Sequence, residues 1–276
     1  MPKTHLLPDG RKLVVDWRPA PAAPSAPAAP PVVFLNGLSQ TTVAWGLQAQ
    51  RLKARRSVLL HDAAGQGRSD PPPETPGGFR PAGHARDLVH LLDAHGVAQA
   101  DVVGFSYGAR IALRLALQDP ARVRRLVLVG CAHRDTTVRR WIVRSWLDAI
   151  DTGGLEHAFR VVTPMVVGER WLARYEKDER AMLRAFVERN APEGVRRLLS
   201  DTLLPGGALG ADDLARVAHP ALVVRGEEDL VVSAAISEEL ASLLPDARHV
   251  TCPGVGHSVA IEAPDWFTSR IEEFLA

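Results

Sequence analysis

Six short aliphatic runs are the feature that most constrains how this chain can fold. They show little alternation of apolar and polar residues, which is typical of parallel strands buried on both faces of a sheet. Helix-like segments lie between most of them, at 81–96, 108–119 and 233–245. Strands and helices in alternation predict an α/β fold with a mostly parallel central sheet. The six runs are 32–37, 57–62, 100–105, 125–130, 221–226 and 247–252.

Three stretches depart from this alternation. Residues 4–17 predict two short strands joined by a Pro-Asp-Gly turn. Residues 19–31 contain only Pro, Ala and Ser, which cannot bury a core, so we expect an enlarged loop between strands. Residues 134–215 carry apolar residues at helical spacing without a convincing strand. The sequence therefore predicts a core of residues 1–133 and 216–276, with a helical cap of residues 134–215 inserted over one end of the sheet.

Charge, cysteine content and apolar runs limit the class of protein. A net charge of +1 gives no reason to expect nucleic acid or an anionic membrane as a partner. The chain has no run of 18 apolar residues, and its first residues lack the apolar core of a secretory signal. Its two cysteines, Cys131 and Cys252, are too few for a disulfide framework. We therefore expect a cytoplasmic enzyme or binding protein, and the sequence gives no indication of its oligomeric state.

A serine stands between two glycines where a predicted strand meets a predicted helix. The pentapeptide is Gly-Phe-Ser-Tyr-Gly, residues 104–108, with Ser106 at its centre. Alone it is weak evidence, because such a pattern arises by chance in roughly one chain in ten. The strand–turn–helix context is what a nucleophile elbow requires, since the tight turn needs small neighbours and exposes the hydroxyl above the sheet edge. We therefore predict that Ser106 is a nucleophile, with a plain turn as the alternative.

A serine hydroxyl needs a base and an orienting acid to become a nucleophile. His257 lies in a glycine-rich loop after the last predicted strand, from which its side chain can reach back over the sheet. Asp229 follows the strand at 221–226 and is preferred over Glu227 and Glu228 because it projects furthest into the loop. Asp135, after another strand, is the alternative acid. The predicted catalytic residues are thus Ser106, Asp229 and His257.

Stabilising a tetrahedral oxyanion requires a pair of backbone N–H groups. One is expected from Tyr107, the residue after the predicted nucleophile. The other is expected from Leu38, because Gly37 before it allows the backbone to approach closely. Only the amides matter in this role, so the side chains carry little information about it.

Four residues are candidates for the wall of a substrate pocket. Asn36 stands at the predicted oxyanion turn, where hydrogen bonding within the loop is its alternative role, and three tryptophans lie near it or in the predicted cap. Packing in the core or within the cap is the alternative role for each tryptophan. The tryptophans are Trp45, Trp141 and Trp146.

Together these residues make the chain resemble the α/β hydrolases over nearly its whole length, since the order Ser, Asp, His along the chain is theirs. Residues 61–70 are similar to that family's D-x-x-G-x-G-x-S segment, in which Asp62, Gly65, Gly67 and Ser69 would be structural. The resemblance implies a helical cap that shapes an acyl pocket. It also implies a cofactor-free serine esterase that cleaves small or medium-chain carboxylic esters through an acyl-enzyme.

Two features leave the reaction open within this resemblance. The oxyanion turn reads Asn36-Gly37 where most of these enzymes have His-Gly, and with the Thr-Thr pair after it this is similar to bacterial acyltransferases that join hydroxyacyl chains into a rhamnolipid precursor. The cap arginines Arg139, Arg140 and Arg144 are expected mostly on a solvated helix face, with recognition of a carboxylate or phosphopantetheine as the alternative. Acyl transfer, lactone or C–C bond hydrolysis, and a non-catalytic small-molecule receptor therefore stay open.

No metal or nucleotide cofactor is expected. The sequence contains no H-E-x-x-H motif, no C-x-x-C pair and no Walker A loop. The elbow carries a serine where a haloalkane dehalogenase would need an aspartate. The expected partner is a small ester or acyl substrate.

Overall fold

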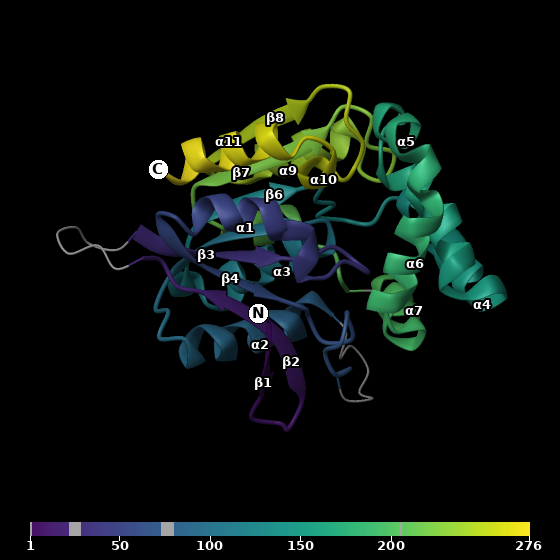
Figure 1. Ribbon diagram of the computed structural model, residues 1–276. Helices are drawn as coiled ribbons and strands as arrows, with labels where there is room; N and C mark the ends of the chain where they lie inside the picture. The colour runs from purple at the N-terminus through teal and green to yellow at the C-terminus, as the bar shows by residue number, and fades with distance from the viewer. Residues whose placement is uncertain (1, 22–28, 73–79, 205) are drawn as a thin grey trace.

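The computed structural model describes residues 2–21, 29–72, 80–204 and 206–276, and an eight-stranded sheet forms its centre (Figure 1). The strand order is β1-β2-β4-β3-β5-β6-β7-β8, with β1 and β2 antiparallel and the other strands parallel to one another. The predicted α/β fold with a mostly parallel sheet is confirmed. The strands are β1 (Lys3–Leu6), β2 (Lys12–Arg18), β3 (Ala29–Leu35), β4 (Arg56–His61), β5 (Ala100–Phe105), β6 (Val123–Val129), β7 (Ala221–Gly226) and β8 (Ala247–Cys252).

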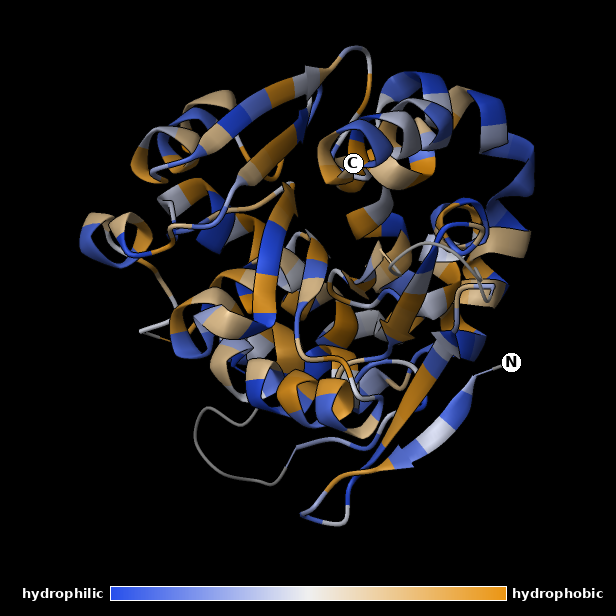
Figure 2. Ribbon diagram, turned by 90° about the vertical axis from the view of Figure 1, so that its left-hand side faces the viewer, coloured by the Kyte–Doolittle hydropathy of each residue, from blue (hydrophilic) through white to orange (hydrophobic). Residues whose placement is uncertain are grey.

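The central strands lack polar alternation because both faces of the sheet are covered. Every residue of β5 and β7 is buried, and Figure 2 shows the hydrophobic colour concentrated in the strands between helices with hydrophilic outer turns. One face packs against α2, α3, α8 and α9, and the other against α1, α10 and α11. These helices are α1 (Gly46–Leu52), α2 (Pro81–Ala94), α3 (Tyr107–Gln118), α8 (Ala211–Ala215), α9 (Ala234–Leu243), α10 (Val259–Glu262) and α11 (Pro264–Leu275).

The two predicted departures from alternation near the N-terminus take different forms. β1 and β2 form the expected hairpin, which extends the sheet beyond β4. The Pro- and Ala-rich stretch ends in β3, which begins at Ala29, earlier than the aliphatic pattern indicates. Residues 22–28 of that stretch lie outside the described residues.

Four helices between β6 and β7 form the inserted unit, which we call the cap. Figure 1 shows them stacked beyond the carboxyl ends of the parallel strands. The first helix is interrupted at Gly153 and Gly154, where Gly154 has φ of 66°, a left-handed conformation that glycine adopts without a steric penalty. Apolar side chains of the cap pack against the loops at this end of the sheet. The helices are α4 (Thr137–Val166), α5 (Glu169–Tyr175), α6 (Glu179–Arg189) and α7 (Pro192–Thr202).

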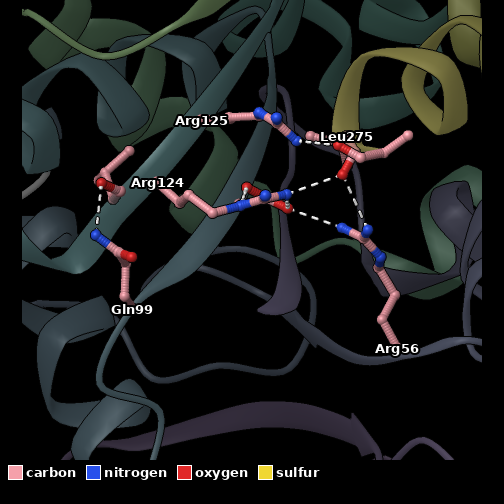
Figure 3. Close-up of polar contacts among 8 residues, drawn as sticks. Arg56, Gln99, Arg124, Arg125 and Leu275 are labelled. Atoms are coloured by element: carbon pink, nitrogen blue, oxygen red, sulfur yellow. Dashed lines mark hydrogen bonds and ion pairs between the residues drawn. The ribbon is translucent and has the colours of Figure 1, made fainter. Parts of the chain in front are cut away.

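The opposite, amino end of the sheet is closed by a buried ion cluster. Asp101, at the start of β5, is fully buried and accepts hydrogen bonds from Arg56 at 2.8 Å and from Arg124 at 2.7 and 2.6 Å. Figure 3 shows both guanidinium groups also reaching the carbonyl of Leu275, at the end of α11. This cluster joins the starts of three strands to the last helix.

None of the helices in the described part of the chain is both long enough and apolar enough to cross a membrane.

Candidate active site

Ser106 lies at a sharp turn between β5 and α3. Its φ of 51° and ψ of −110° are strained for a residue with a side chain, at a cost on the order of 1–3 kcal/mol. The backbone N–H of Ser106 donates to the carbonyl of Val129 at 2.7 Å, which holds the turn against β6. A Cβ at Gly104 or Gly108 would collide with neighbouring backbone atoms. Both glycines are therefore required by the close approach of strand and helix, and the turn leaves Ser106 half-buried at the carboxyl edge of the sheet.

His257 and Asp229 meet at the same edge of the sheet. His257 Nδ1 lies 2.7 Å from Asp229 Oδ2, and both side chains are almost completely buried. The other carboxylate oxygen of Asp229 accepts backbone N–H groups of Val231 at 2.8 Å and Val232 at 2.9 Å. These bonds fix the carboxylate and hence the imidazole. A Cβ on Gly130 would come within 2.7 Å of His257 Cε1, so the imidazole occupies space that only a glycine leaves open.

The other acids considered from the sequence form hydrogen bonds or ion pairs away from His257. Glu227 accepts the backbone N–H of Gly254, and Glu228 accepts that of Glu169 at the start of α5. Asp135 forms an ion pair with Arg139 within the cap. Among the acids considered from the sequence, Asp229 is therefore the one that the structure brings to His257.

Glu262 is a residue that sequence reasoning missed. Its Oε2 accepts the N–H of Gly168 at 2.7 Å and of Gly256 at 3.0 Å, and its Oε1 accepts that of Ser258 at 3.1 Å. Burial raises the pKa of this carboxyl, although the three N–H donors favour its charged form. One side chain thus ties the cap to both neighbours of His257. The signal available in the sequence was that Glu262 lies only five residues after His257.

The predicted oxyanion donors, Leu38 and Tyr107, come from the turn after β3 and from the start of α3. Leu38 follows the turn after β3 and lines the cavity that contains Ser106, and Tyr107 is the first residue of α3. A Cβ on Gly37 would come within 2.6 Å of the Phe105 ring, so the turn packs directly against the residue that precedes Ser106. Ser39, with φ of 58°, continues the turn in a left-handed conformation.

Asn36 is buried and does not line the Ser106 cavity. Its side chain forms hydrogen bonds within the protein core. Its Nδ2 donates to the carbonyl of His61 at 3.0 Å and lies 3.3 Å from Asp62 Oδ1, and its Oδ1 accepts the indole N–H of Trp45 at 2.9 Å. Asp62 also accepts the N–H of Thr42 at 2.6 Å. The side chain of Asn36 therefore braces the turn after β3 against the segment at 61–70.

The predicted pocket tryptophans divide into three positions. Trp45 is buried between Phe34 and Phe267, away from the Ser106 cavity. Trp141 is 69% exposed on the outside of α4, so it does not line the cavity either. Trp146 does line the cavity, and its indole N–H points to Met165 Sδ at 3.2 Å.

One cap arginine also differs from expectation. Arg139 is buried instead of solvated, and its guanidinium pairs with Asp135. Burial and the nearby Arg110 lower the pKa of Arg139 to about 10. Arg140 and Arg144 lie on the exposed face of α4.

Ser106 and His257 open onto a cavity of about 230 Å³ beneath the cap. Among the described residues, no Asp, Glu, Lys or Arg side chain lines it. Apart from the site itself its polar lining is limited to Ser39, Gln40, Thr163 and Ser258. The apolar lining residues are Leu38, Phe105, Trp146, Ile150, Ala158, Phe159, Val162, Val166, Val167, Trp171, Met182, Phe186, Val195, Leu199 and Ile261.

Other reactive groups do not compete with this site. Burial raises the pKa of the Cys131 thiol to about 12 and that of the Cys252 thiol to about 11, which leaves both as poor nucleophiles. Within the described ranges, no group of three or more His, Cys, Asp or Glu side chains is placed to hold a metal ion.

Comparison with known proteins defines the class. The model of the alpha/beta hydrolase family matches residues 32–270. Because this match spans most of the 276 residues, the chain belongs to the alpha/beta hydrolase family, as the sequence motifs indicated. The eight-stranded sheet with its helical insertion is the fold of that family.

Individual relatives are hydrolases named for different substrates. RutD of Azorhizobium caulinodans, provisionally assigned as a carbamate hydrolase, is 31% identical over 252 residues, covering 88% of this chain and 90% of RutD. The 2-hydroxymuconate semialdehyde hydrolase of Pseudomonas putida is 28% identical over 242 residues, covering 84% and 81% of the two chains. The enol-lactonase of Burkholderia xenovorans LB400 superimposes with a TM-score of 0.82 at 25% identity and 97% coverage of both chains. The chain is thus similar to hydrolases of several substrate classes.

Proposed function

We propose that this protein is a serine esterase that cleaves carboxylic esters with an uncharged acyl group of small to medium length. The observation that carries the proposal is the Ser106 elbow and the His257–Asp229 pair on one cavity, together with the absence of charged side chains from its described walls. A charged acyl chain would lose its hydration there without gaining a counter-charge.

The proposed reaction uses a covalent acyl-enzyme. Ser106 Oγ attacks the ester carbonyl while His257 Nε2 takes its proton, since Nδ1 is bound to Asp229. The amides of Leu38 and Tyr107 stabilise the oxyanion, and the alcohol leaves with the proton returned by His257. Water then attacks the acyl-enzyme through the same base, releasing the acid and restoring Ser106.

The volume of the Ser106 cavity supports an acyl group of medium length. At about 30 Å³ per group, the share of a water molecule in the liquid, the cavity of about 230 Å³ holds roughly eight methylene-sized groups. Lactone hydrolysis is a second candidate, because the enol-lactonase resembles this chain over 97% of its length and a cyclic ester needs the same attack and oxyanion.

The test is release of p-nitrophenol from esters of two to twelve acyl carbons, with wild type beside Ser106→Ala. We expect turnover by wild type and a loss of kcat of about 10⁴-fold or more in the variant, because the nucleophile is removed. Full activity in a folded Ser106→Ala protein would falsify the proposal. Analysis of the acyl product, with a hydroxy acid added as acceptor, separates hydrolysis from acyl transfer.

A further inference from the structure

A second hollow lies on the outer side of the cavity that contains Ser106. Its volume is about 570 Å³, whereas the volume of the inner cavity is about 230 Å³. The outer hollow is therefore more than twice as large. The walls of both spaces share four side chains, which come from α4, α5 and α6. A partition one side chain thick therefore separates the outer hollow from the inner cavity. The four residues are Phe159, Thr163, Trp171 and Met182.

The partition is apolar and contains one adaptable side chain. The Thr163 hydroxyl donates to the carbonyl of Phe159 within α4 at 2.6 Å, so its proton is already used. Met182 is half-buried, and its unbranched thioether has three rotatable bonds that adjust to irregular shapes. An alkyl chain that reaches this partition meets no charged side chain, and Met182 is the member of the partition that can move aside.

The outer hollow combines an apolar floor with an acidic rim. The rings of Trp171 and Tyr175, whose centroids lie 4.7 Å apart with their planes tilted by 43°, contribute to the floor with Leu172 and Ala173. The rim carries three carboxylates and one guanidinium, the latter on Arg160, whose Nε lies 3.4 Å from Glu179 Oε1. The charged lining is thus net negative, which disfavours an anionic ligand. The three carboxylates belong to Glu169, Glu176 and Glu179.

We propose that the outer hollow is the distal half of the acyl site and takes the end of an uncharged acyl chain too long for the inner cavity. The inference rests on the proposed esterase function, because the chain reaches the partition only when its carbonyl lies at Ser106. It extends the proposed range of substrates from small and medium acyl groups to long-chain esters that end in an alkyl group rather than in a carboxylate.

A matched pair of alanine variants tests the role of the hollow. Ala173 is exposed and lines the outer hollow only, whereas Ala181, on α6, is also exposed but lines neither space. Ala173→Trp places an indole in the hollow and narrows it, and Ala181→Trp adds the same side chain outside it. The readout is the ratio of kcat/KM for a twelve-carbon ester to that for a four-carbon ester, each below its critical micelle concentration.

In wild type we expect kcat/KM to keep rising beyond eight carbons, by up to about fourfold for each buried methylene. Ala173→Trp lowers the twelve-to-four ratio by about tenfold or more, and Ala181→Trp leaves it within about twofold. The monoester of a twelve-carbon dicarboxylic acid reacts several-fold more slowly than the dodecanoate ester.

Three outcomes would overturn the inference. A wild-type optimum at eight carbons, with the same ratio in Ala173→Trp, would show that the acyl site ends at the partition. Equal rates for the dicarboxylic monoester would remove the charge selection. Turnover of the four-carbon ester distinguishes the two proposals: if it occurs, such failures concern the hollow alone, and if no ester is cleaved, the esterase function and this inference fail together.

Discussion

Each end of the parallel sheet holds a buried carboxylate with a basic partner, and the two are built differently. At the amino end, Asp101 accepts from two guanidinium groups, and the carbonyl at the end of α11 closes the cluster. At the carboxyl end, Asp229 accepts from one imidazole and two backbone amides, and the imidazole lines a cavity. Guanidinium groups stay protonated and can only stabilise. An imidazole can exchange a proton near pH 7, so a carboxylate paired with a base suits the fold at one end and the proposed chemistry at the other.

The comparison of the two ends of the sheet predicts the largest loss of activity for a substitution at Asp229. In Asp229→Asn the amide presents an N–H to His257 Nδ1, which favours the wrong tautomer and lowers kcat by about 10⁴-fold. Because the Asn oxygen can still accept from Val231 and Val232, the free energy of unfolding falls by less than about 1.5 kcal/mol. Ester turnover and urea unfolding measure the two quantities. A variant that loses its stability but not its activity per folded molecule would reverse the assignment.

Asp101→Asn is the mirror experiment at the amino end. It leaves two buried or partly buried guanidinium groups without their counter-charge, so we expect a loss of about 3 kcal/mol in the free energy of unfolding. The cluster lies at the far end of the sheet from Ser106, and kcat per folded molecule stays within about twofold of wild type. Urea unfolding, with active-site titration of the folded fraction, checks both. A large fall in kcat without a change in stability would contradict a purely structural cluster.

The carboxyl end should also respond to pH. Burial lowers the pKa of His61 to about 4, whereas it raises that of its neighbour Asp62 to about 6. The folded state keeps His61 neutral, so its contribution is complete above pH 6.5 and is lost as the pH falls towards 4. Asp62 acts in the opposite direction, since its stabilisation is present at low pH and is lost as the pH rises through 6. In wild type the two contributions largely cancel between pH 4 and 6.

Replacing one member of this pair removes the cancellation. Relative to wild type, His61→Leu gains on the order of 3 kcal/mol of unfolding free energy as the pH falls from 6.5 to 4, because the variant has no imidazole to protonate. Urea unfolding of both proteins at several pH values measures this difference. A constant difference across the range would show that His61 is not held neutral by burial.

Only part of the fold and of the candidate site could be predicted from the sequence. The parallel strands could be predicted because burial on both faces leaves a local mark, an unbroken aliphatic run such as residues 126–129 of β6. The triad candidates could be placed because loops after parallel strands converge at one edge. Trp141 and Trp146 could not be told apart, since the apolar residues of α4 are spread over more than one face of the helix, and only packing shows which of them is buried. The Asp101 cluster was hidden because its partners come from the starts of strands 45 and 23 residues away.

The smallest effect is expected at Arg125, the neighbour of Arg124. Arg125 donates from an exposed position to the carbonyl of Ala276 at 2.7 Å and has no hydrogen bond to Asp101 in the described structure. Solvent competes for such a bond, so Arg125→Ala lowers the free energy of unfolding by no more than about 0.5 kcal/mol. Urea unfolding beside Asp101→Asn makes the comparison direct. If Arg125→Ala lost as much unfolding free energy as Asp101→Asn, the fully buried carboxylate of Asp101 would not be the main source of stability. The number of arginines near the end of α11 would then determine the stability of this end of the sheet.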